Sequence, residues 1–217
     1  MSCRNDGKGG ILCQTVITNL ATKRVALERK IHMKLKKLNA LLGLLSILAM
    51  LLHMGYTIVA YLMFYYNPFL KTVFAVPFMV LVCLHAMCGM LTVFMQADGT
   101  RMDLYPKQNV RTILQRVSAA LILPLLILHI NTFSMMKAAS EGGQMIVVLL
   151  LIAAELLFFA TALTHVATSL TKGFITLGLL SSLDAQKKLD VVIYVILAIA
   201  FVVAAYAVVS TQVAMFL

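Results

Sequence analysis

The chain has 217 residues, of which 62% are hydrophobic and 12% charged, and its mean hydropathy is +0.97. A soluble domain is closer to half apolar, so this composition excludes one and predicts an integral membrane protein. The net charge of +10 does not indicate a nucleic-acid-binding surface, because nine of the eighteen Lys and Arg residues precede residue 38 and the last 29 residues have none. Such an uneven distribution sets the orientation of membrane helices instead.

Residues 1–37 are expected to form a basic segment outside the membrane. Within it, residues 11–37 predict an amphipathic helix at the membrane surface. His32 stands among lysines there and is expected to be solvated. The segment has no compact apolar region before a small-residue cleavage site, so we expect no cleaved signal peptide. The remainder, residues 38–217, is expected to form one transmembrane domain.

Five apolar stretches follow this segment, and each is long enough to cross a bilayer as a helix. They are expected at residues 38–66, 72–96, 111–136, 144–172 and 189–216. The connectors between them contain Pro, Gly, Asn and charged residues, which favour turns. The sequence therefore predicts an all-α membrane protein with five transmembrane helices. Lys and Arg gather on the side of the N-terminus, while the opposite connectors contain only Lys71 and Lys137, so the N-terminus is expected in the cytoplasm.

Each of the first four spans contains one histidine: His53, His85, His129 and His165. An ionisable side chain inside a membrane normally faces the bundle interior and has a partner. Given the helical rise and alternating helix directions, His53 and His129 fall at one depth, and His85 and His165 lie roughly 10–15 Å closer to the cytoplasm. Two imidazoles that face each other across a bundle at one depth are a bis-histidine axial site for haem iron. The first four spans are therefore predicted to bind two haems, of b type because no CxxCH is present.

Two small residues support this interpretation. Gly89 and Ser169 stand four positions after His85 and His165, on the same helix face, where a small side chain leaves room for a flat macrocycle.

The four histidines, these small residues and the run ILQRVSAA at residues 113–120 resemble a known family. It is the dihaem cytochrome b membrane-anchor subunit of succinate:quinone and quinol:fumarate oxidoreductases, of the single-chain, five-helix type. The resemblance covers nearly all of residues 38–217. The run is similar to an ILHRVSG-like motif that stands near the quinone in related one-haem anchors.

The resemblance implies that His85 and His165 hold the haem nearest an iron–sulfur subunit and that His53 and His129 hold the distal haem. It also implies a flavoprotein subunit that interconverts succinate and fumarate, an iron–sulfur subunit on the cytoplasmic face, and a place in the bacterial cytoplasmic membrane. The chain would then transfer electrons between the iron–sulfur subunit and membrane quinone, either menaquinone or ubiquinone. The succinate and fumarate chemistry would take place in the flavoprotein.

By its likeness to the ILHRVSG motif, Arg116 is the candidate for polarising a quinone carbonyl, with Gln115 and Ser118 beside it. A contact with a haem propionate is the alternative role for these residues. The run departs from the motif because Gln115 replaces its histidine and alanines replace its glycine region. Glu155 is an acid well inside the fourth span, ten residues before His165. A carboxyl there is expected to be protonated or paired, which makes Glu155 a candidate for proton handling.

Two alternative functions stay open at this point. One is a b-type anchor of another respiratory oxidoreductase, such as a hydrogenase or formate dehydrogenase, although those usually place their histidines differently. The other is a haem-free, proton-coupled transporter or assembly protein in which the histidines and Glu155 form a proton relay. Transporters often have helices broken by Gly or Pro in corresponding spans. Here Pro77 and Pro124 are isolated, which disfavours transport.

Overall fold

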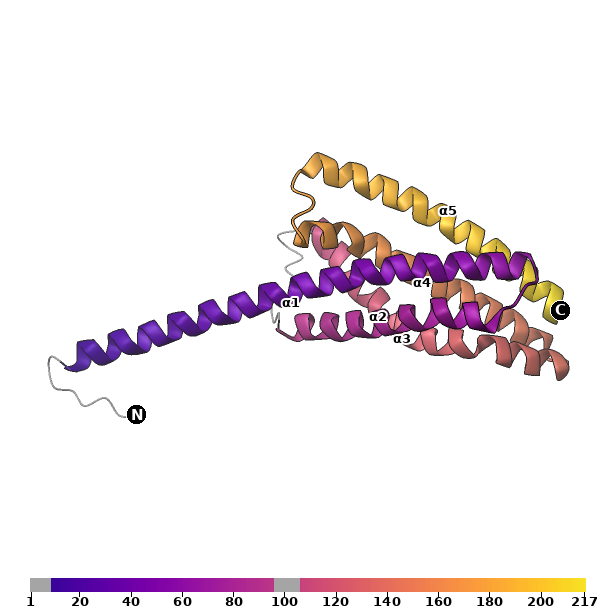
Figure 1. Ribbon diagram of the computed structural model, residues 1–217, viewed down its shortest axis with the longest axis horizontal. Coiled ribbons are helices and arrows are strands. Elements are labelled where there is room, and N and C mark those ends of the chain that lie inside the picture. Colours follow the sequence, from indigo (N-terminus) through magenta and orange to yellow (C-terminus); the bar gives the residue numbers. More distant parts are fainter. Residues whose placement is uncertain (1–8, 96–105) are drawn as a thin grey trace.

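The computed structural model describes residues 9–95 and 106–217, and over these residues the chain consists of five α-helices and their connectors. The helices are α1 (Gly9–Leu62), α2 (Pro68–Met95), α3 (Pro106–Glu141), α4 (Met145–Thr176) and α5 (Leu183–Phe216). They run alternately up and down in one bundle (Figure 1). Each contains a stretch long and apolar enough to cross a membrane, which confirms the expected all-α membrane fold. We call the end at which α3 and α5 begin the inner end, and the opposite end the outer end.

The connectors stop the helices by ordinary capping chemistry. Asn67 caps α2, because its side-chain oxygen accepts hydrogen bonds from the first free backbone N–H groups of that helix and Pro68 follows it. Gly143 and Gly178 have φ values of +69° and +78° and terminate α3 and α4, as only a residue without Cβ does at low cost. Ser182 caps α5 by accepting from the N–H of Ala185 at 3.1 Å.

The helices associate as two close pairs, α1 with α2 and α3 with α4, and α5 packs beside them. Helix α4 contacts α1, α3 and α5. It contains ten of the buried residues, whereas only Thr92 is buried among the described residues of α2. A compact apolar cluster closes the outer end of α3, α4 and α5 and consists of Met136, Ala139, Val148, Leu151, Ile152 and Phe216. The bundle is thus held most firmly around α4.

The expected boundary at residue 37 is not marked by any break in the chain. Instead, α1 continues as one helix of 54 residues from the basic segment into the first membrane span. Between Ile11 and Leu42 there is no Gly or Pro to interrupt the hydrogen-bond ladder. Figure 1 shows the first part of α1 projecting well beyond the other four helices. The basic residues Lys23, Lys30 and Lys37 therefore lie on a projecting rod that continues the spanning helix.

Candidate haem-binding site

The inner end of the bundle brings His85 of α2 and His165 of α4 close together, with one ring edge-on to the other. Their ring centres are 6.3 Å apart and the ring planes are inclined by 64°. Two imidazoles on opposite sides of one metal, each with a metal–nitrogen bond of about 2 Å, would have their ring centres about 6 Å apart. These two histidines come from different helix pairs and were predicted as one axial pair. The distance between their ring centres is close to the value that a shared metal ion would give.

Hydrogen bonds on Nδ1 determine how both inner rings are oriented. Nδ1 of His85 lies 3.1 Å from the backbone carbonyl oxygen of Asn39, and Nδ1 of His165 lies 3.1 Å from that of Gln115. A carbonyl only accepts, so both Nδ1 atoms carry the proton, and each Nε2 has its lone pair available. Within the part of the chain that the structure describes, neither Nε2 has a hydrogen-bond partner. Ligating histidines are typically held in this way, with Nδ1–H on a carbonyl and Nε2 towards the metal.

Gly43 of α1 lies directly against the ring of His85. A Cβ atom at position 43 would lie 3.0 Å from Cε1 and 3.3 Å from Nδ1 of His85. Both distances are shorter than ordinary carbon–carbon or carbon–nitrogen contact. Asn39, which accepts the hydrogen bond from His85, lies four residues earlier on the same face of α1. This face of α1 therefore supports the inner histidine by both shape and hydrogen bonding.

Gly43→Ala is expected to displace His85 and weaken haem retention at the inner site. The matched control is Gly55→Ala on the same helix, since a Cβ there meets nothing within 4 Å. Replacing a helical Gly by Ala otherwise stabilises a helix by about 1 kcal/mol. The control should therefore raise the melting temperature slightly and leave haem content unchanged, while Gly43→Ala should lower both. Haem content per chain and thermal unfolding in detergent measure these effects. Equal behaviour of the two variants would show that Gly43 does not position His85.

His129 of α3 lies nearer the outer end, and its side chain is 28% exposed. Its Nδ1 lies 2.8 Å from Oε2 of Glu155 on α4, and that carboxyl is only 5% exposed. The ring of Phe158 stacks on the imidazole with centres 4.7 Å apart and planes inclined by 23°. Phe159 approaches the same imidazole edge-on at 6.1 Å. Glu155, expected to be protonated or paired, is thus paired, and its partner is one of the four predicted ligands.

His53 of α1 is held less firmly than the other three histidines. Its ring stacks on Phe78 of α2 with centres 5.6 Å apart, and it lies close enough to His129 for the two to interact electrostatically. Its Nδ1 is buried without a hydrogen-bond partner among the described residues. A buried nitrogen without a partner costs free energy unless something else satisfies it. The outer pair therefore has one well-oriented histidine and one whose imidazole is left to be satisfied by another group.

The residues singled out by their likeness to a quinone motif have different environments. Ser118 is buried, and its hydroxyl donates to the carbonyl of Leu114 and lies 3.3 Å from Nδ1 of His165. The side-chain oxygen of Gln115 accepts a hydrogen bond of 2.9 Å from Nζ of Lys172, and its backbone carbonyl accepts one from His165. Arg116 is exposed. Ser118 and Gln115 thus belong to the inner histidine's surroundings, and Arg116 lies on the bundle surface beside them.

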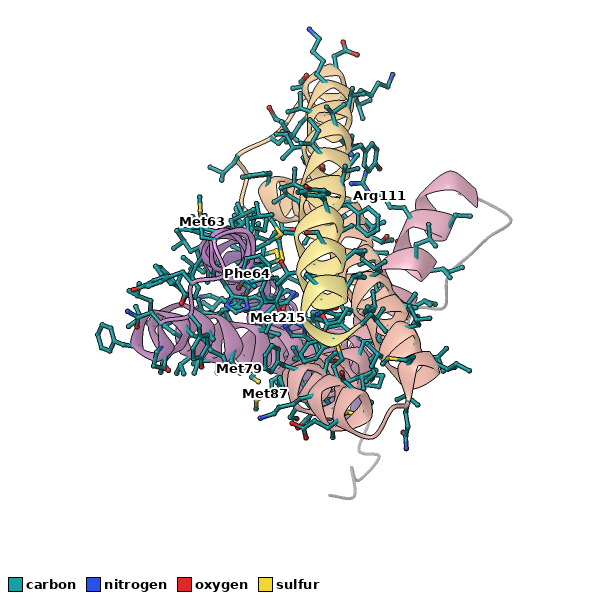
Figure 2. All side chains as sticks on the ribbon, turned by 90° about the vertical axis from the view of Figure 1, so that its right-hand side faces the viewer. Met63, Phe64, Met79, Met87, Arg111 and Met215 are labelled. Atoms are coloured by element: carbon teal, nitrogen blue, oxygen red, sulfur yellow. The ribbon has the colours of Figure 1, made fainter. Side chains whose placement is uncertain are left out.

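Sequence reasoning missed a polar cluster at the inner end of α3, α4 and α5. Arg111 forms two hydrogen bonds of 2.9 Å with the carboxylate of Asp190, and its Nε donates to the carbonyl of Thr168. The hydroxyl of Thr171 also donates to Asp190. Figure 2 shows Arg111 beside α5, which carries Asp190. Asp190, at the second position of the last predicted span, could have indicated this cluster, because a carboxylate at the end of a membrane span needs a basic partner.

The two small residues predicted to make room for a macrocycle are occupied in other ways. A Cβ at Gly89 would lie 3.7 Å from the side-chain oxygen of Asn39, which is ordinary van der Waals contact. The hydroxyl of Ser169 donates to the carbonyl of His165 within its own helix. The side-chain oxygen of Asn39 is itself buried without a partner among the described residues.

Within the described ranges, no group of three or more His, Cys, Asp or Glu side chains is arranged to hold a metal ion. A haem iron takes only two protein ligands, so this finding leaves a bis-histidine site unaffected. No protein-family model, curated protein or solved structure matches the chain. The functional argument therefore depends on the residues themselves.

Proposed function

We propose that the chain is the cytochrome b membrane anchor of a succinate dehydrogenase or fumarate reductase complex, carrying electrons through two b haems. The observation that supports this most strongly is the inner histidine pair. The ring centres of His85 and His165 are 6.3 Å apart, and each ring has Nδ1–H on a backbone carbonyl and Nε2 available. An integral membrane protein has few reasons to bring two neutral imidazoles together in this way without a metal between them.

In this proposal the four histidines hold the haems, with His85 and His165 at the inner site and His53 and His129 at the outer site. When bound, the haems supply one-electron transfer between the two ends of the bundle. At the outer site, the contact of His129 Nδ1 with Glu155 would leave Nε2 of His129 for the iron, and His53 would supply the second ligand. The inner pair is the better supported of the two, because its ring separation and both of its Nδ1 contacts are defined.

The cations of the inner end suit the acidic groups of a haem or the carbonyls of a quinone. Lys172 is half-buried and directs Nζ at Thr112 and Gln115, close to the residues that hold His165. Arg116 follows Gln115 on α3, and its side chain is exposed. Both are positioned to neutralise a propionate or to polarise a quinone carbonyl, because a cation near a low-dielectric site acts strongly on an oxygen anion. We assign the quinone contact to Arg116 and Lys172.

The partners in this proposal are a flavoprotein and an iron–sulfur subunit on the side of the inner haem. The N-terminal rod of α1 carries nine Lys and Arg residues together with the short stretch before it, and it would project towards these partners in the cytoplasm of a bacterium. Positive charge of this kind steers an acidic partner and sets its orientation. The five apolar spans would anchor the assembly in the membrane.

The deciding experiment is a reduced-minus-oxidised optical spectrum of the purified chain with pyridine haemochrome quantification. We expect about two b haems per chain. Flavin and non-haem iron should co-purify with the tagged chain from its native membrane, together with succinate-dependent reduction of a quinone. A folded preparation without haem would refute the electron-transfer function. Haem without flavin would leave an anchor of another respiratory enzyme.

A buried proton-handling pair is what favours the second candidate, a haem-free proton-coupled transporter. His129 and Glu155 form such a pair inside the bundle, with Glu155 fully enclosed. Buried carboxylate–imidazole pairs are common in membrane proton relays. The haem measurement separates the two functions, because a transporter of this kind would retain its activity in vesicles made from haem-deficient cells.

A further inference from the structure

An exposed apolar stripe runs along α1 from Leu27 to Leu62, with residues alternately three and four positions apart. We call it the α1 stripe. Its large apolar residues are each between 41% and 58% exposed, and only Lys34 and Gly55 depart from the apolar pattern. The first six of these apolar residues are Leu27, Ile31, Leu38, Leu41, Leu45 and Leu48. This spacing is a heptad repeat, in which the positions called a and d form the contact between two helices of a coiled coil.

The α1 stripe extends from the membrane into water. The lysines just before Leu38 place the edge of the hydrocarbon near that residue, and Leu27 precedes it by eleven positions. On a straight helix Leu27 therefore lies about 16 Å beyond this edge. The headgroup layer is only roughly 5–8 Å thick. Leu27 thus stands on the projecting rod of α1 beyond the lipid, although it is large, apolar and 58% exposed.

A second copy of α1 matches both parts of the α1 stripe. Lipid tails cover the part from Leu38 to Leu62 but do not reach Leu27, and a soluble protein reaches Leu27 but not the part inside the membrane. We propose that α1 pairs with α1 of a second copy of this chain in a parallel coiled coil that continues from the membrane into the rod. The two copies cross the membrane in the same direction, so their two-fold axis is perpendicular to its plane.

The position of α1 in the bundle leaves the α1 stripe free for such a partner. Asn39, Gly43 and Ser46 lie on the opposite side of the helix, where Asn39 and Gly43 contact His85 and Ser46 is buried. The contacts of α1 with α2, α4 and α5 therefore leave the stripe exposed. In Figure 2 the outer end of α1, marked by Met63, lies at the edge of the bundle.

Charges beside the α1 stripe suit a parallel pair. In a parallel coiled coil, residues at position g of one helix form ion pairs with residues at position e of the other. In this register Lys23 stands at g and Glu28 at the following e, so a pair of copies offers this attraction twice. Arg24 and Lys34 stand at a and d positions themselves. Polar residues there lower the stability of a coiled coil but specify its register and number of strands.

Oxidative cross-linking of single-cysteine variants of the full chain in its native membrane tests the proposed pair. The natural cysteines are first replaced by alanine at Cys3, Cys13, Cys83 and Cys88. Leu27→Cys then places a thiol on the stripe in the rod, and Leu48→Cys places one on the stripe in the span. A disulfide requires Cα atoms within about 7 Å, which only helices in direct contact provide. Both variants should give a product of twice the chain mass that a reductant cleaves.

Two equally accessible positions away from the α1 stripe provide the controls. Met33 lies on another side of the rod and is 62% exposed, and Val80 lies on α2 within the second span and is 52% exposed. Met33→Cys and Val80→Cys should remain monomeric under the same oxidation. The proposal would be overturned by equal product from the controls, by product from only one of the two stripe variants or from neither, or by a product whose mass shows a different protein.

A further substitution tests whether the apolar character of the stripe holds the two rods together. Ile31→Lys adds a charge to the stripe, and in the Leu27→Cys chain it should lower the cross-linked fraction. Met33→Lys adds the same charge off the stripe and should leave that fraction unchanged. Equal yields from the two would overturn the role of the stripe. Haem content should be the same in all these variants, because the stripe contains none of the four proposed ligands, so failure of the pairing leaves the proposed function intact.

Discussion

Replacing His165 by alanine is expected to remove one of two b haems, and replacing His85 should remove the same one. The two imidazoles lie side by side at the inner end, with ring centres 6.3 Å apart, so under the proposed function each variant leaves a single axial ligand for a haem that needs two. The double variant should lose no more haem than either single one, because both residues serve one site. His129→Ala should remove the other haem. Haemochrome quantification with the reduced-minus-oxidised spectrum measures each loss.

The control for this series is His32→Ala, because His32 precedes the apolar part of the first span and is expected to be solvated. It should keep both haems. The informative contradiction would be additive loss, with His85→Ala and His165→Ala removing different haems. That result would break the predicted pairing, although haem binding itself would stand. Retention of both haems by every variant would show that other residues ligate the iron.

Removal of the Arg111 side chain is expected to cause the largest loss of stability outside the histidines. Arg111→Met leaves Asp190 of α5 with Thr171 as its remaining partner. Side chains in the Arg111–Asp190 pair are 19% and 17% exposed, and breaking so enclosed a pair costs about 3 kcal/mol. For a chain of this size that corresponds to a fall in melting temperature of roughly 6–12 °C. Circular dichroism at the helical minimum, recorded during heating in detergent, measures it.

A second ion pair of the same chain provides the matched control for Arg111. Lys137 and Glu141 lie 3.9 Å apart on α3 with side chains 66% and 68% exposed. An exposed pair of this kind contributes less than about 1 kcal/mol, so Lys137→Met should change the melting temperature little. Combining Arg111→Met with Asp190→Leu should recover part of the loss, because no charge then remains unpaired. Equal effects of Arg111→Met and Lys137→Met would show that the inner ion pair does not hold α5 in place.

Hydropathy was sufficient to predict the helices, because each crossing needs a long apolar stretch and the connectors carry strong turn signals. The helix ends were less accurate. α3 begins at Pro106 rather than at residue 111, and α5 at Leu183 rather than at residue 189. Polar residues continue a helix beyond the apolar stretch at no cost when water or headgroups surround them. The apolar pattern therefore marks what lies in the membrane, whereas capping residues such as Ser182 mark where the helix starts.

In the candidate site, the sequence predicts the depth of each histidine in the membrane, but it does not predict how each helix is rotated about its axis. The shared depth of His85 and His165 follows from the rise per residue and the alternating helix directions, both of which are available in the sequence. The partners of their Nδ1 atoms depend on how each helix is rotated about its axis, and nothing in the sequence predicts that the carbonyl of Asn39 meets His85. Arg111 and Asp190 are 79 residues apart and meet only because α3 and α5 begin at the same end.

The division of the helices into two close pairs has a consequence for how the protein is made. α1 and α2 form a hairpin that is complete before α3 and α4 are synthesised, and each hairpin packs more closely within itself than against the other. Every predicted ligand pair takes one histidine from each hairpin, His53 with His129 and His85 with His165. Under the proposed function, each haem would therefore link the hairpin of α1 and α2 to the hairpin of α3 and α4. Biogenesis then becomes a docking reaction whose rate follows the cellular supply of haem, and cells deprived of haem should accumulate hairpins open to the quality-control proteases of the membrane.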